Sequence, residues 1–482
     1  MSSPLISALL LFFAPAAAEP LDKYLKQFVD MVAVVQAEAA DPVDMTKAFY
    51  EGAIPGMLRR LDPHSVFFDP GQFAQLKELE KSTRKGFGSV VSILPGRVIV
   101  LQTLPGTPSA KSGISPGDEI IAINNIRLDR LEIEQLIQLL TQSRQKEVHL
   151  HVRRPGSARI LQFVLTPEDV DAPSVERVFH VRPQIGYIRV SSFDAPTGKE
   201  LKEGIEKLGG ANLKGLILDL RNNMGGLLPP ALETAALFLK PGQKILSVRG
   251  RSVTGEEVTV PESAVPYTFP LAVLINGKSA SASEIVAGAL QDHDRAAIVG
   301  ENSFGKGLVQ SVFPLSEGTG MALTTAFYYT PSGRSIQKHL ATGQLQAEEV
   351  EKEYHTDSGR PVKGGGGIQP DRVVPPEGVT RLRAVLEATG SFTSFATSYL
   401  QKHRNVSPDL EIDSGILDEF QAVLSQNNIR PGIGEWSQER EWIRSRLEQE
   451  ILNQAVGVEK GDEVEAQRDP QVEAALEAIG AL

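Results

Sequence analysis

The 482-residue sequence contains no cysteine, only eight histidines and no dense run of Lys and Arg. The absence of cysteine excludes disulfides, thiolate metal sites and a cysteine nucleophile. No histidine pair shows the HExxH spacing or a comparable one, so neither a metal nor another cofactor is expected. With a net charge of −11 and no basic cluster, the chain lacks the contacts that nucleic acid or an anionic membrane would need.

Long apolar runs are lacking as well. The uncharged N-terminal run from Leu5 to Ala18 has 14 residues, and a bilayer requires about 20. It is interrupted by Pro15 and ends in three alanines before Glu19, although its first residues include no Lys or Arg. The pattern is typical of a signal peptide and predicts cleavage after Ala18 and an exported, periplasmic or envelope-associated protein. A buried N-terminal helix is the alternative.

Hydrophobic residues make up 41% and charged residues 23% of the chain, which is the composition of a folded protein. The length implies several domains. After a signal peptide at 1–18, the periodicity predicts a helical segment (19–84), a strand-rich unit with one helix (85–169), a core of alternating strands and helices (170–376) and a helical region (377–482). The expected fold class is therefore α/β and multidomain. Within the core, the run Gly364 to Gly367 is expected to be a flexible joint.

Ser281 follows an apolar strand that ends near Ile275, and a helix is predicted to start directly after it. Ser281 and Glu284 have the spacing of a capping box, which explains both residues without any catalytic role. A serine at this position would also lie beside free helix N–H groups and the positive end of the helix dipole, which stabilise a developing oxyanion. The capping sequence by itself does not distinguish the structural interpretation from the catalytic one.

Lys306 stands between two glycines, beside Phe304 and ahead of Leu308, in an unusually apolar setting for a lysine. A lysine acts as a general base only after losing its proton, and lowering its pKa from about 10.4 to near 7 requires about 4 kcal/mol. Desolvation by apolar neighbours can supply this. Gln310, four residues further on, could accept a hydrogen bond from the amine.

A glycine-rich turn follows the apolar strand that ends at Leu220. Its sequence, Arg-Asn-Asn-Met-Gly-Gly at 221–226, would direct backbone N–H groups toward one point. An ordinary strand–helix turn is the simplest interpretation. A phosphate-binding loop is disfavoured because neither GxxxxGK[ST] nor GxGxxG is present.

Four ordered segments, LDLRNNMGG, ASASEIVAGAL, FGKGLVQ and YYTPSGRSIQ, together resemble the carboxyl-terminal processing peptidases, also called tail-specific proteases. The resemblance spans residues 61–375. It implies a crotonase-like ββα core and a serine endopeptidase that uses a Ser–Lys mechanism on protein or peptide substrates with free C-termini. It leaves open a homodimer and a lipoprotein adaptor, and the 377–482 region is expected to be a helical packing or dimer-forming element.

Site residues follow from the same resemblance. It implies Ser281 as nucleophile, Lys306 as base and Gln310 as the residue that supports the base. It also implies that the oxyanion is bound by the amides of Gly225 and Ala282. Met224 stands where the family often has proline, which leaves the choice between Gly225 and Gly226 open.

The 85–169 unit resembles the PDZ domain that this family usually carries before its core. The tripeptide Gly86-Phe87-Gly88 resembles a carboxylate-binding loop, and the strand after it could pair with a bound peptide. A glycine-rich turn without a ligand is the alternative for this tripeptide.

Two further functions compete with the Ser–Lys endopeptidase. A non-catalytic relative could bind peptides or lipophilic ligands on the same core, but the presence of Ser281, Lys306 and Gln310 disfavours it. A Ser-His-Asp protease would need a histidine near Ser281. His293 lies 12 residues further along the same predicted helix, a distance of about 18 Å, which is too far for it to serve as the base.

Overall fold

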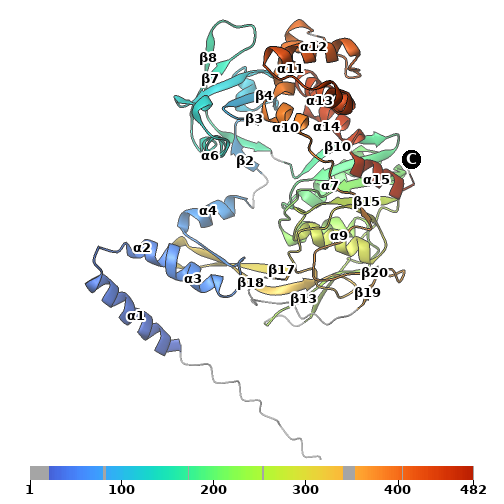
Figure 1. The fold of residues 1–482 in the computed structure, drawn as a ribbon. Coiled ribbons are helices and arrows are strands. Elements are labelled where there is room, and N and C mark those ends of the chain that lie inside the picture. Colours follow the sequence, from blue (N-terminus) through green and yellow to red (C-terminus); the bar gives the residue numbers. More distant parts are fainter. Residues whose placement is uncertain are drawn as a thin grey trace, which may run out of the picture.

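The computed structural model describes residues 21–79, 83–171, 173–251, 255–339, 353–403 and 405–480. The predicted signal peptide and its cleavage site lie outside these residues. The described chain forms an N-terminal segment, a β-rich unit, an α/β core and a C-terminal helical region (Figure 1). No helix in the described ranges is both long and apolar enough to span a bilayer.

The N-terminal segment is not purely helical, contrary to the expectation for 19–84. Helix α1 has no buried residue and extends away from the core (Figure 1). A short strand, β1, pairs antiparallel with β18 of the core. The elements are α1 (Leu21–Glu38), α2 (Met45–Lys47), the π-helix η1 (Ala48–Ala53), α3 (Ile54–Arg59), β1 (Val66–Phe68), α4 (Pro70–Leu79) and β2 (Thr83–Gly86). The segment is therefore partly built into the core sheet, because β1 supplies one of its strands.

The β-rich unit is an antiparallel sheet around an apolar core that includes Val98, Ile120 and Leu136. Among the described strands, its first strand, β3, pairs with β4 alone, so its other edge has no strand partner in this part of the chain. The elements are β3 (Ser89–Leu94), β4 (Arg97–Thr103), α5 (Pro108–Lys111), β5 (Glu119–Ile123), β6 (Ile126–Arg127), the 3-10 helix η2 (Leu128–Arg130), α6 (Ile133–Ser143), β7 (Val148–Arg153) and β8 (Ile160–Leu165). Strand β2 pairs with β9 (Glu168–Asp171), which brings the two ends of the unit together.

The core contains a six-stranded sheet in the order β10-β11-β12-β15-β16-β21, parallel except for β10. Both β12 and β15 are completely buried, and their continuous apolar runs suit parallel strands covered on both faces. The strands are β10 (Val175–Arg182), β11 (Ile185–Val190), β12 (Gly215–Asp219), β15 (Leu271–Ile275), β16 (Ala297–Gly300) and β21 (Arg372–Val373), and the helices are α7 (Thr197–Lys207), the 3-10 helix η3 (Gly210–Asn212), α8 (Leu228–Ala236) and α9 (Ala282–Asp292). The expected α/β alternation is confirmed.

A second sheet, in the order β1-β18-β13-β14 with β17 on β18, completes the core. Its strands are β13 (Lys244–Arg249), β14 (Glu256–Thr259), β17 (Leu308–Pro314) and β18 (Gly320–Tyr329), with the 3-10 helix η4 (Ser316–Gly318) between the last two and the hairpin β19 (Tyr354–His355)–β20 (Pro361–Val362) further along the chain. The expected flexible joint at Gly364 to Gly367 is wrong. Gly365 N–H donates to Ser335 O (2.8 Å), and a Cβ on Gly367 would lie 2.7 Å from Ser303 O. These glycines allow close backbone packing, not motion.

The C-terminal region is helical, as expected. Four helices share an apolar core that includes Phe392, Phe420 and Ile443. The next two cover the face of the core sheet opposite α9 (Figure 1). The helices are α10 (Arg381–Ala388), α11 (Ser391–Lys402), α12 (Ser414–Gln426), α13 (Ile433–Ala455), α14 (Val458–Gln467) and α15 (Pro470–Ala478). Val458 N–H also donates to Gln102 Oε1 of β4 (3.1 Å), so this region contacts the β-rich unit and the core together.

Candidate active site

Ser281 is the N-cap of α9, which begins at Ala282 as predicted. The backbone N–H of Ser281 donates to Glu284 Oε2 (2.8 Å), but the Ser281 hydroxyl makes no capping hydrogen bond with the helix. Its φ of 56° lies in the left-handed region, which non-glycine residues rarely adopt. Capping alone therefore does not explain the strained backbone of Ser281.

The buried carboxylate of Glu284 joins the Ser281 turn to the Lys306 loop. Besides Ser281 N–H, it accepts hydrogen bonds from Ser303 Oγ (2.5 Å), Gly305 N–H (2.7 Å) and Lys306 N–H (2.9 Å). Four donors match the acceptor capacity of one ionised carboxylate. The same side chain therefore sets the position of both loops.

Tyr328 adds a second connection between these loops. Its hydroxyl lies within hydrogen-bonding distance of two carbonyl oxygens, Lys306 O (2.7 Å) and Ser281 O (3.2 Å). Two backbone groups 25 positions apart in the sequence thus meet at one phenol. The predicted nucleophile and the predicted base are neighbours in the fold.

The side chain of Lys306 makes the contact expected from its spacing to Gln310. Lys306 Nζ donates to Gln310 Oε1 (2.8 Å), and Gln310 Nε2 donates in turn to the carbonyl oxygen of His64 (2.6 Å). The amide of Gln310 is thereby held at both ends. This orients the lysine amine and leaves the lone pair of its neutral form free to accept a proton.

Burial lowers the pKa of Lys306, and the negative charges of Glu284 and Asp62 oppose that shift without cancelling it. Burial raises the pKa of Glu284, and its four hydrogen bonds act in the opposite direction. The lowered pKa of Lys306 is the change that a lysine needs to act as a base near neutral pH.

The glycine-rich turn lies against Ser281, the predicted nucleophile. A Cβ on Gly225 would lie 2.9 Å from Ser281 Cβ and 3.0 Å from Ala282 N. However, Gly225 N–H already donates to Asn223 Oδ1 (2.8 Å). Among the described residues, Gly226 N–H and Ala282 N–H have no protein acceptor. The hydrogen bond to Asn223 therefore argues against Gly225 as oxyanion donor and favours Gly226 together with Ala282.

The structure excludes His293, the histidine considered above, as the base for Ser281. His293 caps the far end of α9, and its ring nitrogens contact Asp357 Oδ2 (2.8 Å) and Lys244 O (2.7 Å). Within the described part of the chain, no group of His, Asp and Glu residues is arranged to hold a metal ion.

The predicted peptide-binding tripeptide lies at one end of a groove of about 340 Å³ between β3 and α6. Gly86 ends β2, and Phe87 and Gly88 lead into β3. Gly88 has a φ of 73°, and a Cβ there would lie 2.2 Å from Thr107 Cβ. The groove is lined by apolar side chains that include Val91, Ile137 and Leu140, with Lys85 and Arg144 among its polar residues.

Comparisons with known proteins agree with this arrangement. Residues 184–347 match peptidase family S41, and residues 77–153 match the PDZ domain. A carboxy-terminal-processing protease of Bartonella bacilliformis is 37% identical over 332 residues, which cover 68% of this chain and 76% of that protein. The chain belongs to peptidase family S41. This S41 peptidase is a serine-type enzyme with a PDZ domain, and the expected fold class and activity are confirmed.

The chain is also similar to two further processing proteases, one by sequence and one among solved structures. A carboxyl-terminal-processing protease of Synechocystis sp. is 37% identical over 292 residues, covering 59% of this S41 peptidase and 68% of the relative. Among solved structures, a photosystem II D1 C-terminal processing protease is 27% identical and has a TM-score of 0.41, covering 73% of this chain and 88% of that one.

Sequence reasoning missed the part of the site contributed by the N-terminal segment. Asp62 is fully buried, and its carboxylate accepts hydrogen bonds from the backbone N–H groups of His64 (2.7 Å) and Ser65 (2.8 Å). The resulting turn presents His64 O to Gln310. A signal was present, because Asp-Pro-His-Ser at 62–65 is a turn sequence, but nothing local indicates that it contacts a residue nearly 250 positions later.

Proposed function

We propose that this S41 peptidase cleaves peptide bonds with Ser281 as nucleophile and Lys306 as general base. The hydrogen bond from Lys306 Nζ to Gln310 Oε1 carries the proposal, because it orients an amine whose pKa is lowered by burial. Neutral Lys306 accepts the proton of the Ser281 hydroxyl while Oγ attacks the scissile carbonyl carbon. The resulting ammonium then returns the proton to the leaving amine, and a water molecule repeats the sequence on the acyl-enzyme.

The oxyanion of the tetrahedral intermediate would be stabilised by the amides of Ala282 and Gly226. Ala282 N–H stands at the start of α9, where the helix dipole favours negative charge. Gly226 N–H belongs to the turn that contacts Ser281 and has no protein acceptor among the described residues. Preorganised donors of this kind are worth about 10²–10³ in rate each.

The substrates are proposed to be proteins with free C-termini, in line with the names of the relatives. The terminal carboxylate would bind near Gly86, Phe87 and Gly88, and the peptide would pair with the open edge of β3. An apolar terminal side chain fits the groove lining between β3 and α6. The homodimer and the lipoprotein adaptor remain predictions.

Export is proposed from the N-terminal sequence. A mature chain beginning at Glu19 would carry out its reaction outside the cytoplasm, in the periplasm or at the cell envelope. Mass spectrometry of secreted or periplasmic protein checks this, and recovery of the intact 1–482 chain from the cytosol would contradict it.

The test of the function compares the 19–482 protein with its Ser281→Ala variant on an unfolded protein substrate. We expect cleavage by the first and none by the second, with identical circular dichroism spectra. Equal cleavage by both proteins would show that another residue is the nucleophile.

A further inference from the structure

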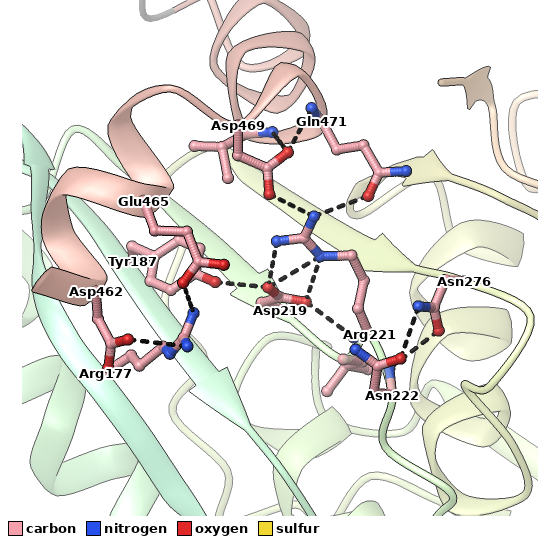
Figure 2. Close-up of polar contacts among 12 residues, drawn as sticks. Arg177, Tyr187, Asp219, Arg221, Asn222, Asn276, Asp462, Glu465, Asp469 and Gln471 are labelled. Carbon is pink, nitrogen blue, oxygen red and sulfur yellow. Dashed lines mark hydrogen bonds and ion pairs between the residues drawn. The ribbon is translucent and has the colours of Figure 1, made fainter. Parts of the chain in front are cut away.

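A buried carboxylate and a guanidinium define the point at which β12 ends and the glycine-rich turn begins. Asp219 has 1% of its side chain exposed, and Arg221 has 17%. Arg221 Nε donates to both Asp219 oxygens (3.0 Å each), Nη2 donates to Oδ2 (2.6 Å), and Arg221 N–H donates to Oδ1 (2.8 Å) (Figure 2). Although burial alone would raise the pKa of Asp219, the Arg221 charge and these hydrogen bonds hold it below its ordinary value.

The turn that follows Arg221 is connected directly to the nucleophile. The backbone N–H of Asn222 donates to Asn276 Oδ1 (3.0 Å), and Asn276 Nδ2 donates back to Asn222 Oδ1 (3.1 Å). The carbonyl oxygen of Asn223 then accepts from Ala280 N–H (3.0 Å) and Ser283 Oγ (2.9 Å), on either side of Ser281. A displacement of Arg221 would therefore move Gly226, the proposed oxyanion donor of this turn, relative to Ser281.

The remaining donor group of Arg221 is bound by the C-terminal region. Arg221 Nη1 donates to Asp469 Oδ2 (2.6 Å) and to Gln471 Oε1 (2.8 Å) (Figure 2). Gln471 Nε2 in turn donates to Val374 O (2.7 Å), and Asp469 Oδ1 caps α15 by accepting from Gln471 N–H (2.8 Å). Arg221 and Asp469 are 248 positions apart in the sequence, so no local preference places them together.

Helix α15 is itself packed as part of the core. Its residues Val472, Ala475 and Leu476 belong to the same apolar cluster as Ile217 of β12 and Leu274 of β15. A second ion-pair group holds α14, where Arg177 of β10 contacts Asp462 (2.9 Å) and Glu465 (3.0 Å) (Figure 2). The start of α15 is thus held at a defined position beside the turn.

We propose that Arg221 is a positioning residue for the oxyanion turn and that Asp469 and Gln471 are required to hold it, which makes the C-terminal segment a working part of the peptidase site. The proposal rests on the proposed Ser–Lys function. A guanidinium bound on two sides has one orientation, because its donors form a rigid fork. Without Asp469 and Gln471, the Arg221 guanidinium is held by Asp219 alone. It can then shift, and the turn that follows it shifts as well.

The test uses the 19–482 protein carrying Asp469→Asn, Gln471→Leu, both together, or Arg221→Lys. Asparagine still caps a helix, so Asp469→Asn removes the charge with little effect on α15. Glu477→Gln is the matched control, because Glu477 pairs with Arg372 and also ties α15 to the core, but without contacting the turn. Measurements are kcat and KM on a peptide substrate, the affinity for a peptidyl boronic acid that forms a tetrahedral adduct with serine, and the melting temperature.

We expect kcat to fall about 10-fold in each single C-terminal variant and about 100-fold in Arg221→Lys, with KM within twofold, since small displacements at a reacting centre have effects of this size. Boronate affinity should fall in parallel with kcat, because the boronate mimics the oxyanion-bearing state. Glu477→Gln should keep kcat within twofold of the wild type.

Unchanged kcat and boronate affinity in both Asp469→Asn and Arg221→Lys would overturn the positioning role. So would equal losses in Asp469→Asn and Glu477→Gln, because they would show that only the attachment of α15 matters. A wild-type protein that neither cleaves the peptide nor binds the boronate would instead contradict the proposed function, and this proposal with it.

Discussion

Two helices that line the two proposed sites differ sharply in burial. All residues of α9, which carries Ser281 at its N-cap, are buried. In α6, which lines the proposed peptide groove, Leu136 and Ser143 are the buried residues, and Ile137 keeps 48% of its surface exposed. Both helices have a side chain three positions after the N-cap that accepts a hydrogen bond from the N-cap N–H: Glu284 in α9 and Gln135 in α6.

The difference reflects what each helix must do. Covalent chemistry needs reacting groups that are already in position, so α9 is surrounded and its cap carboxylate is shared by four donors. A groove that accepts varied chain ends benefits from open apolar surface, which α6 supplies. The same local motif is a structural cap in α6 and part of the proposed catalytic site in α9.

The largest expected effect comes from removing the dyad on α9 and its neighbouring loop. Ser281→Ala and Lys306→Ala should each lower kcat/KM by at least about 10³-fold, and the double variant should be scarcely worse, because the two residues act as one unit. Lys306→Arg should lose activity as well, since a guanidinium stays protonated and cannot act as a base. Turnover of an unfolded substrate is the measurement. A folded Lys306→Ala enzyme with near wild-type turnover would rule out the Ser–Lys mechanism.

The two capping side chains offer the most direct test of the comparison. In Glu284→Gln the amide nitrogen would face donors that have lost their acceptor, which should lower the free energy of unfolding by about 2–4 kcal/mol. Gln135→Ala in α6 removes one exposed hydrogen bond (3.1 Å) and should cost less than about 1 kcal/mol. Urea denaturation measures both. Equal losses of unfolding free energy would mean that burial does not make the Glu284 cap more important for stability than the Gln135 cap.

The pH dependence of activity distinguishes a lysine base from a histidine base. Because the neutral amine is the base and burial lowers its pKa, activity should rise about tenfold per pH unit up to the pKa of Lys306 and stay high above it. That inflection should lie below the ordinary lysine value of 10.5. Burial and the nearby Lys306 lower the pKa of His64 below 6.5, so a histidine base would give an inflection below that pH.

The matched variant for this measurement is His64→Gln. It retains the backbone carbonyl that binds Gln310 and removes the imidazole, so kcat against pH should keep the same inflection. Loss of the rising limb in His64→Gln would assign the base to His64 and not to Lys306.

Among the substitutions expected to impair function, those in the open groove should have the smallest effect. Ile137→Asp places a charge among apolar side chains and should weaken binding of a peptide with an apolar C-terminus about 5–10-fold, with little change in melting temperature because Ile137 is half exposed. Fluorescence anisotropy with free-acid and C-terminally amidated peptides measures both features. Amidation should cost a further 1.5–3 kcal/mol, roughly, if the Gly86 to Gly88 loop binds the carboxylate. Equal affinity for the free-acid and the amidated peptide would contradict carboxylate binding by this loop.

Much of the site could be predicted from local patterns. The limits of β15 and α9 follow from a continuous apolar run and a capping residue, and the spacing from Lys306 to Gln310 correctly indicated their hydrogen bond. Such features involve residues a few positions apart, so periodicity and spacing carry them. The glycines at 364–367 show the limit of this reasoning. Glycine permits both flexibility and close packing, and only the neighbouring Ser303 and Ser335 decide between them.

By itself, the sequence determined the order of the helical and strand-rich regions and the buried strands β12 and β15, and it predicted Ser281, Lys306 and Gln310 as nucleophile, base and supporting side chain. Tertiary structure alone decided that His64 O accepts a hydrogen bond from Gln310 and that Asp469 binds Arg221. The physical reason is that each contact joins two segments far apart in the sequence. The local structure of each segment forms without the other, so local patterns give no sign of the contact. Such contacts form only when the sheet and its covering helices bring distant turns to the same edge.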